Sequence, residues 1–301
     1  MKITIFTPTY NRAYILGNLY RSLQRQTCRE FEWLIIDDGS ADNTEALVAD
    51  WIREENDFPI RYFKVPNGGK HRAWNKALDL AEGELFFTVD SDDYLTEDAV
   101  QKILHWANSL PKNGQFCGVA GNLGTSVTES PNSRLPQPYF EGTALDRYSR
   151  VNGERAMVFF TDTHRKYRYP EFEGENFMTE AVTWNRMAHD GYQMRFYNDI
   201  IWIFEYLPDG LTRSGSSIFL KNPRGHGIFL REKAEFLNYP LIEKMKMWYN
   251  FYCDHTFCDA QYRLTKTQCA QYIGAPPAFI YLSALVHRMP KFIRTFLKKQ
   301  K

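Results

Sequence analysis

Apolar runs and amphipathic stretches alternate along the first part of the chain. Short apolar runs predict strands at residues 2–7, 31–36, 60–65 and 85–89, the first breaking at Pro8. Apolar positions spaced three and four apart predict helices at about 13–26, 43–55 and 70–81. Because strands that alternate with helices pair in parallel through right-handed crossovers, the pattern predicts an α/β fold.

The remainder of the chain has a less regular pattern. From about 114 to 168 the sequence is irregular, and proline-containing stretches at 130–138 predict loops. A helix is expected over 180–189 and a strand over 200–204, and the chain turns helical again from about 233. We therefore expect a sheet-containing domain at 1–215 and a helical C-terminal extension at 216–301.

Polar residues follow the end of each predicted strand. They are Thr7-Pro8-Thr9-Tyr10, Asp37-Asp38, Gly68-Gly69-Lys70 and Asp90-Ser91-Asp92-Asp93. Because ligands of open parallel sheets bind beyond the carboxyl ends of the strands, we expect these four segments to meet at one edge. Their convergence indicates a ligand site more strongly than any one of them does.

The acidic segment 90–93 predicts a metal site. Its three carboxylates raise one another's pKa unless a cation or hydrogen-bond donors lie among them. Carboxylate oxygens bind Mg²⁺ or Mn²⁺ when a diphosphate supplies the remaining coordination. The alternative is a surface turn that caps the helix beginning near Thr96, because Asp is a good N-cap residue.

Composition and charge narrow the possible functions. The chain has 301 residues, of which 44% are hydrophobic and 24% charged, with a formal net charge of +1. This balance carries no bulk electrostatic signal for nucleic acid. The five cysteines are odd in number and scattered, and no secretory signal begins the chain, so we expect reduced thiols in a cytoplasmic protein. Cys253, His255 and Cys258 lack a fourth ligand for a structural zinc.

The last stretch of the chain is basic and amphipathic. From Ala260 to Lys301 there is no acidic residue, and cations accumulate from Arg288 onward among Phe292, Ile293, Phe296 and Leu297. Such a tail predicts a helix on the anionic inner face of the cytoplasmic membrane. The alternative is a helix packed on the domain with a solvated basic tail.

The strand-end segments together resemble the nucleotide-sugar-dependent glycosyltransferases of family 2, which have the GT-A fold. The resemblance covers roughly residues 1–125. It rests on TPTYNR at 7–12, LIIDDGSADNT at 34–44, NGGKHRAWNKAL at 67–78 and AEGELFFTVDSDD at 81–93. It implies a Rossmann-like, mostly parallel sheet flanked by helices, with the nucleotide-sugar-binding and catalytic domain at 1–215.

The resemblance also implies roles for individual residues. Tyr10 would stack on the base, and Asp38 would accept the uracil N3–H, which cytosine lacks. Lys70 and His71 lie where a helix N-terminus and a basic side chain meet a diphosphate. The donor contacts expected from it are Thr7, Pro8, Tyr10, Asp38, Lys70, His71, Asp90 and Ser91, and the expected ligands of Mn²⁺ or Mg²⁺ are Asp92 and Asp93.

The resemblance further implies a single displacement with inversion, which needs a carboxylate base. Glu180, at the start of a predicted helix, is our choice, and Glu175 and Glu173 are rivals. The family often carries Glu-Asp here, whereas this chain has Glu180-Ala181. The alternative for Glu180 is a residue of the first helical turn that the helix dipole favours.

The sequence thus predicts a metal-dependent hexosyltransferase. It would move a sugar from a UDP-sugar to a hydroxyl of a glycan or lipid-linked acceptor in cell-surface polysaccharide synthesis. Two alternatives stay open, a sugar-phosphate nucleotidyltransferase and a catalytically silent nucleotide-sugar-binding module. A dehydrogenase is disfavoured because no Gly-x-Gly-x-x-Gly follows the first strand.

Overall fold

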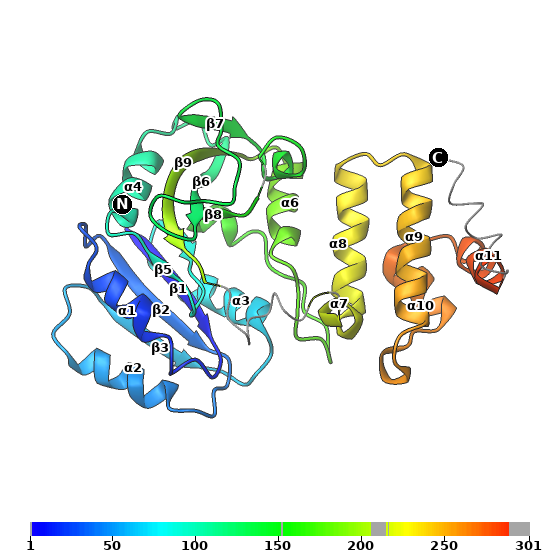
Figure 1. Cartoon of the computed structure of the whole chain (residues 1–301), viewed down its shortest axis with the longest axis horizontal. Helices are drawn as coiled ribbons and strands as arrows, with labels where there is room; N and C mark the ends of the chain where they lie inside the picture. The colour runs from blue at the N-terminus through cyan, green and yellow to red at the C-terminus, as the bar shows by residue number, and fades with distance from the viewer. Residues whose placement is uncertain (1, 152, 206–214, 216, 289–301) are drawn as a thin grey trace. The chain divides into compact units, whose positions relative to one another are not determined.

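The computed structural model describes residues 2–151, 153–205, 215 and 217–288 of the chain. The chain forms two compact units (Figure 1). The first comprises Met1–Glu171 with Thr183–Arg213, and the second comprises Phe172–Val182 with Ser214–Lys301. The expected boundary between 215 and 216 stays a prediction.

Within the described residues of the first unit, nine strands form one sheet in the order β3-β2-β1-β4-β8-β6-β9-β5, and β7 pairs with β9. The strands are β1 (Ile3–Thr9), β2 (Phe31–Asp37), β3 (Ile60–Lys64), β4 (Leu85–Thr88), β5 (Tyr94–Leu95), β6 (Phe116–Gly124), β7 (Tyr139–Gly142), β8 (Arg155–Phe160) and β9 (Gln193–Ile203). The first four pair in parallel, as do β6 and β9, while β8 is antiparallel to both of its neighbours. The predicted α/β class is confirmed.

Helices cover both faces of this sheet (Figure 1). They are α1 (Gly17–Gln24), α2 (Thr44–Arg53), α3 (Lys70–Leu80), α4 (Ala99–Asn108), α5 (Thr161–His164) and α6 (Ala181–His189), with a 3-10 turn η1 at Ala144–Tyr148. Residues of α1, α2 and α4 share one core with Trp33 and Phe87. On the other face Trp74 of α3 contacts Phe6 and Phe86.

Strand β1 runs past the proline at which the sequence predicts its end. The residue pairs Pro8 with Ile36 and Thr9 with Asp37 extend the ladder to β2. On the other side the pairing with β4 stops at Phe6. Pro8 therefore lies beyond the last β4 pair, where its missing N–H costs no ladder hydrogen bond.

The irregular region predicted from 114 to 168 contains two central strands, β6 and β8. The loops predicted at 130–138 are confirmed. The two strands were not predicted, because β6 carries glycines, which are depleted in strands. A Cβ on Gly118 would overlap the carbonyl oxygen of Val158 in β8, so the close approach of the two backbones requires glycine. The same residue type that weakens the sequence signal allows the strands to pair.

At the amino edge of the sheet a buried carboxylate has a full set of partners. Glu32 accepts hydrogen bonds from Thr4 (2.6 Å), Arg61 (3.0 Å) and the Glu82 N–H (2.9 Å). Burial alone would raise the pKa of Glu32, but these donors hold it below its usual value. Charge at this edge is therefore compensated within the first unit.

The described part of the second unit is built from helices. They are α7 (Ser217–Lys221), α8 (Pro223–Phe236), α9 (Leu241–Thr256), the 3-10 turn η3 (Ala260–Tyr262), α10 (Lys266–Ile273) and α11 (Pro277–Arg288). Its core includes Phe251, Ile273 and Ile280. Among the described residues, no helix combines the length and apolar character needed to cross a bilayer. The predicted amphipathic tail at 289–301 lies outside the described residues.

Candidate functional site

Three of the predicted polar segments meet at the carboxyl edge of the first unit's sheet. Tyr10 follows β1, Asp38 follows β2, and Asp90 lies just past β4. Parallel pairing sets Thr9 beside Asp37 and Phe6 beside Thr88. The fourth segment joins them at the start of α3, because Lys70 Nζ lies 2.6 Å from Asp90 Oδ1.

The aromatic ring expected to stack on a base is accessible. Tyr10 is 49% exposed, unlike the buried strand that precedes it. The next residue, Asn11, has a left-handed backbone with φ of 53°, which Asn tolerates better than most residues. Its N–H donates to Ser40 Oγ (2.8 Å), and its Oδ1 accepts from the Ala41 N–H (2.8 Å). The loops after β1 and β2 are thereby tied together, a contact that the sequence did not reveal.

Asp38 orders the glycine loop before α3. Its two carboxylate oxygens accept from the N–H groups of Gly68 (2.7 Å) and Gly69 (2.8 Å), and Asn67 donates to its carbonyl oxygen (2.8 Å). Burial raises the pKa of Asp38, and the two N–H donors oppose that rise. Asn67 also donates to Oδ2 (3.2 Å), so Oδ1 is the carboxylate oxygen that keeps a second lone pair. Asp38 can therefore hold this loop and still accept a ligand N–H.

Two further polar residues near this edge have structural roles. Asp37 accepts from the Ser40 N–H (2.7 Å) and from the Tyr62 hydroxyl, so it braces the turn after β2. Asn75 of α3 donates to the Tyr169 carbonyl (3.0 Å). Both side chains are occupied within the fold.

The acidic segment carries an excess of negative charge. Burial raises the pKa of Asp92, and Asp90 adds to the rise. Burial, then Asp90 and Asp92, raise the pKa of Asp93 to about 8, although Trp202 Nε1 donates to its Oδ2 (2.8 Å). Lys70 offsets part of this charge through its contact with Asp90. Glu32 at the opposite edge is surrounded by hydrogen-bond donors, whereas the carboxylates of the acidic segment repel one another.

The cluster fits a divalent cation that is shared with a diphosphate. In the described part of the chain, no group of three or more His, Cys, Asp or Glu side chains is set to hold a metal ion unaided, which also leaves Cys253, His255 and Cys258 without support as a zinc site. A magnesium-type ion, however, takes only one or two carboxylates when phosphates complete its shell. Asp90 and Asp92 supply such oxygens, and a cation would relieve the repulsion that raises their neighbour's pKa.

Other predicted donor contacts are placed less favourably. Thr7 is fully buried, and its hydroxyl accepts from Trp33 Nε1 (2.9 Å). His71 is buried, and burial followed by the nearby Arg72 lowers its pKa to about 4, so it is neutral at pH 7. Contact of either residue with the donor stays a prediction, which the burial of both side chains does not favour. Pro8 is half-buried in β1, and Ser91 is buried in the acidic segment.

The three candidate bases differ in what surrounds them. Glu175 is buried, and its oxygens accept from the N–H groups of Arg224 (2.8 Å) and Gly225 (2.9 Å). Glu173 is exposed. Glu180 is half-buried and directly precedes α6 in the segment that belongs to the second unit. Its place relative to the acidic cluster stays a prediction.

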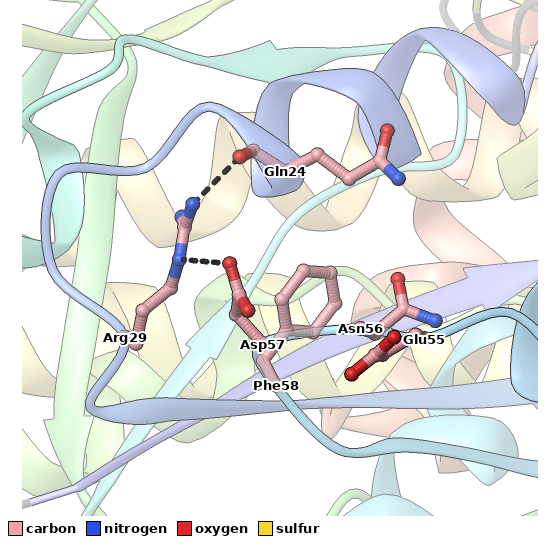
Figure 2. Close-up of a pocket in the computed structure, with 6 residues that line it drawn as sticks. All are labelled: Gln24, Arg29, Glu55, Asn56, Asp57 and Phe58. Carbon is pink, nitrogen blue, oxygen red and sulfur yellow. Dashed lines mark hydrogen bonds and ion pairs between the residues drawn. The ribbon is translucent and has the colours of Figure 1, made fainter.

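A polar hollow of about 220 Å³ lies elsewhere in the first unit (Figure 2). It is lined by Gln24, Arg29, Glu55, Asn56, Asp57 and Phe58. These residues end α1 or precede β2 and β3, so the hollow is at the amino edge of the sheet. Arg29 donates to the Gln24 carbonyl (2.8 Å) and pairs with Asp57 (3.5 Å). None of the predicted site residues lines it.

Comparisons with known proteins bear on the family and on the fold. The family described as glycosyl transferase family 2 matches residues 4–169. A curated relative from Campylobacter jejuni subsp. jejuni serotype O:2, named GalNAc(5)-diNAcBac-PP-undecaprenol beta-1,3-glucosyltransferase, is 28% identical over 199 residues. The match covers 61% of this chain and 58% of that protein.

Two solved structures share the fold. Staphylococcus aureus TarS 1–349 in complex with UDP-GlcNAc has a TM-score of 0.59 at 16% identity, covering 96% of this chain and 92% of that one. The mannosyltransferase PcManGT from Pyrobaculum calidifontis, in complex with GDP-Man and Mn²⁺, has a TM-score of 0.56 at 17% identity, covering 99% and 84%. The predicted GT-A fold, with its mostly parallel sheet flanked by helices, is confirmed.

Proposed function

The chain belongs to glycosyl transferase family 2, and from this membership we propose that it transfers a sugar from a UDP-sugar to a hydroxyl of a glycan or lipid-linked acceptor in cell-surface polysaccharide synthesis. The observation that carries the proposal is the convergence of Tyr10, Asp38 and the Lys70–Asp90 pair at one edge of the sheet. The Campylobacter relative, whose name specifies an undecaprenol-linked acceptor, supports the acceptor class.

The donor nucleotide would be held by the loops after β1, β2 and β4. Tyr10 stacks on the base with its exposed ring, and Asp38 accepts the uracil N3–H on a lone pair that the glycine loop leaves available. Lys70, at the N-terminus of α3, exchanges its contact with Asp90 for one with the diphosphate. Asp90 is then available for the ribose and for the metal ion.

Asp92, together with Asp90, would hold Mn²⁺ or Mg²⁺, and Asp93 is a further candidate. The Trp202 hydrogen bond occupies one oxygen of Asp93, so we rank it after the other two. When bound, such a cation neutralises charge that develops on the departing nucleoside diphosphate. The Mn²⁺ of the Pyrobaculum structure supports a divalent ion.

Glu180 would act as the general base. It takes the proton from the acceptor hydroxyl while that oxygen attacks the anomeric carbon, and the bond from this carbon to the diphosphate breaks. Attack from the side opposite the leaving group inverts the configuration. Glu175, whose oxygens are both engaged by backbone N–H groups, is less suited to take up a proton.

We predict that UDP with Mn²⁺ raises the melting temperature of the protein more than GDP, CMP or dTDP does. A ligand at about 100 times its Kd adds roughly 2.7 kcal/mol to the free energy of unfolding. A thermal-shift series measures this, and UDP with EDTA instead of Mn²⁺ is the control. A larger shift with GDP would overturn the assignment of Tyr10 and Asp38 to uracil.

UDP release from a panel of UDP-sugars tests catalysis itself. Turnover distinguishes the proposed transferase from the silent nucleotide-sugar-binding module. A sugar-phosphate nucleotidyltransferase would instead form a nucleotide sugar from a nucleoside triphosphate and a sugar phosphate. Absence of UDP release with every UDP-sugar tested, despite UDP binding, would favour the silent module.

We also propose that the C-terminal region contacts the inner face of the cytoplasmic membrane. Residues 260–301 hold eight of the 37 Lys and Arg and none of the 36 Asp and Glu, so they carry a formal charge of +8 and the preceding residues −7. In α11, Tyr281, Leu282 and Leu285 are 51%, 56% and 59% exposed. Lys266 Nζ lies 5.1 Å from the centre of the Tyr281 ring. Apolar and cationic groups side by side suit an anionic bilayer surface.

The protein is therefore expected to co-sediment with vesicles that contain phosphatidylglycerol and not with pure phosphatidylcholine. The double variant Leu282→Glu/Leu285→Glu should lose at least about tenfold in vesicle affinity, because it places two anions on the exposed apolar surface of α11. The matched control is Leu241→Glu/Ile242→Glu on α9, where the side chains are 65% and 58% exposed. Equal losses in both variants, or no binding by the unmodified protein, would contradict the proposal.

A further inference from the structure

The helix α8 does not cap its own N-terminus. Asn222 occupies the N-cap position, where the side chain usually accepts from the second or third helical N–H, yet it makes no such bond. Its Oδ1 accepts instead from the N–H groups of Asn176 (2.8 Å) and Phe177 (3.0 Å). Its Nδ2 donates to the Ile218 carbonyl (2.7 Å). The Asn222 side chain thus binds a segment that lies more than forty residues earlier in the chain, since the two hydrogen bonds span 46 and 45 positions.

A residue of that earlier segment, Glu175, caps the N-terminus of α8 in place of Asn222. Pro223, the first residue of α8, has no N–H, so Arg224 and Gly225 carry the first free amides of the helix. Both donate to the carboxylate of Glu175, at 2.8 and 2.9 Å. A carboxylate at a helix N-terminus is favoured by the helix dipole as well as by the hydrogen bonds. We call this reciprocal arrangement of Glu175 and Asn222 the cap exchange.

Side-chain packing fixes the same segment. Phe177 contacts Phe219 edge to face, with ring centres 5.6 Å apart. Met178 is buried, and a Cβ on Gly225 would lie 3.1 Å from its Cε. Glu175 and Asn222, whose side chains accept the four hydrogen bonds of the cap exchange, are themselves buried. The backbone from 175 to 178 is therefore held by contacts made within the second unit.

We propose that the cap exchange positions the general base, so that Glu175 and Asn222 are positioning residues for the transfer reaction. This inference rests on the proposed role of Glu180, which follows Met178 by two residues and precedes α6. A displacement of about 1 Å at a reacting group can cost on the order of a hundredfold in rate. A base at the end of a segment needs that segment to be rigid, and the cap exchange supplies the rigidity.

The test is the Asn222→Ala variant of the full chain. Amide hydrogen exchange over 176–180 should rise at least about tenfold, because Asn176 and Phe177 lose their acceptor. Turnover with the most active UDP-sugar of the panel should fall by about tenfold or more, with KM for the donor unchanged. Asn222→Asp keeps an acceptor oxygen at the same place and should restore most of both.

The matched control is Thr265→Ala, which removes the capping box of α10 in the same unit. It should lower stability without changing exchange over 176–180 or turnover. If Asn222→Ala leaves exchange over 176–180 as in the unmodified protein, the cap exchange does not hold the segment. If exchange rises and turnover does not fall, or falls equally in Thr265→Ala, the positioning role is wrong.

Failure of the proposed function is recognised separately. Normal turnover of a Glu180→Gln variant would show that Glu180 is not the base, and it would leave the exchange result intact. Loss of turnover in Asn222→Ala alongside normal turnover in Glu180→Gln would mean that the segment serves another step. The positioning of Glu180 would then be overturned.

Discussion

The Glu180→Gln variant is expected to bind UDP as the unmodified protein does and to transfer sugar about 10²–10⁴-fold more slowly. Gln has nearly the same shape as Glu but cannot accept the proton of the acceptor hydroxyl, and general base catalysis is typically worth this factor. Two measurements decide it, UDP binding by thermal shift and initial rates of UDP release with acceptor present.

The control for Glu180→Gln is Glu173→Gln, an exposed carboxylate in the same segment. Its rate should stay within about twofold of the unmodified protein, because surface substitutions of this kind change little. A Glu180→Gln protein with normal turnover would show that the base lies elsewhere. Loss of UDP binding in it would indicate a structural rather than a chemical defect.

The second large effect is expected for Asp92→Asn. Asparagine offers one neutral oxygen in place of a carboxylate, so the affinity for Mn²⁺ in the presence of UDP should fall. Electrostatic stabilisation by a metal is worth several kcal/mol, which corresponds to more than about a hundredfold in rate. The measurement is the Mn²⁺ dependence of both the UDP thermal shift and UDP-sugar turnover.

Asp98→Asn provides the comparison for Asp92→Asn. Asp98 lies just beyond the acidic segment and pairs with Lys102 at 2.8 Å on α4. Its replacement should leave the Mn²⁺ dependence unchanged. If Asp92→Asn also keeps the Mn²⁺ dependence of the unmodified protein, the metal site is not formed by this residue.

The part of the fold predicted best is the part with the strongest periodicity. The strands and helices predicted in the first ninety residues lie within a few residues of their observed bounds, because each apolar run is bracketed by turn residues. Strands β5, β6, β7 and β8 were missed, and β9 begins at Gln193 and not near residue 200. The Gly118 and Gly121 that weaken the pattern of β6 are needed for its neighbours, since a Cβ on Gly121 would crowd Ile201 of β9.

The edge that carries the candidate site was predictable from topology, but the partners of its residues were not. The Trp202 that donates to Asp93 is 109 positions away, and Asn67 is 29 positions from Asp38. Such contacts depend on the order of strands in the sheet, which sequence patterning alone does not give.

Orientation was the other missing element. Thr7 and His71 are of the right residue type for a diphosphate, yet both are buried. Glu175 and Glu180 are both acidic residues near the start of α6, and the sequence does not show that the carboxylate of Glu175 binds the first N–H groups of α8. The role of Glu180 as base stays a prediction.

The division of the chain also bears on how such proteins recombine. Because Phe172–Val182 groups with the C-terminal helices, the chain passes into the second unit and back again at the two ends of this segment, before it reaches those helices. A chimera that exchanges only the C-terminal helices with those of a relative would set Glu175 against a foreign helix start. The segment 172–182 and the start of α8 must therefore be exchanged together, although more than thirty residues of sequence separate them.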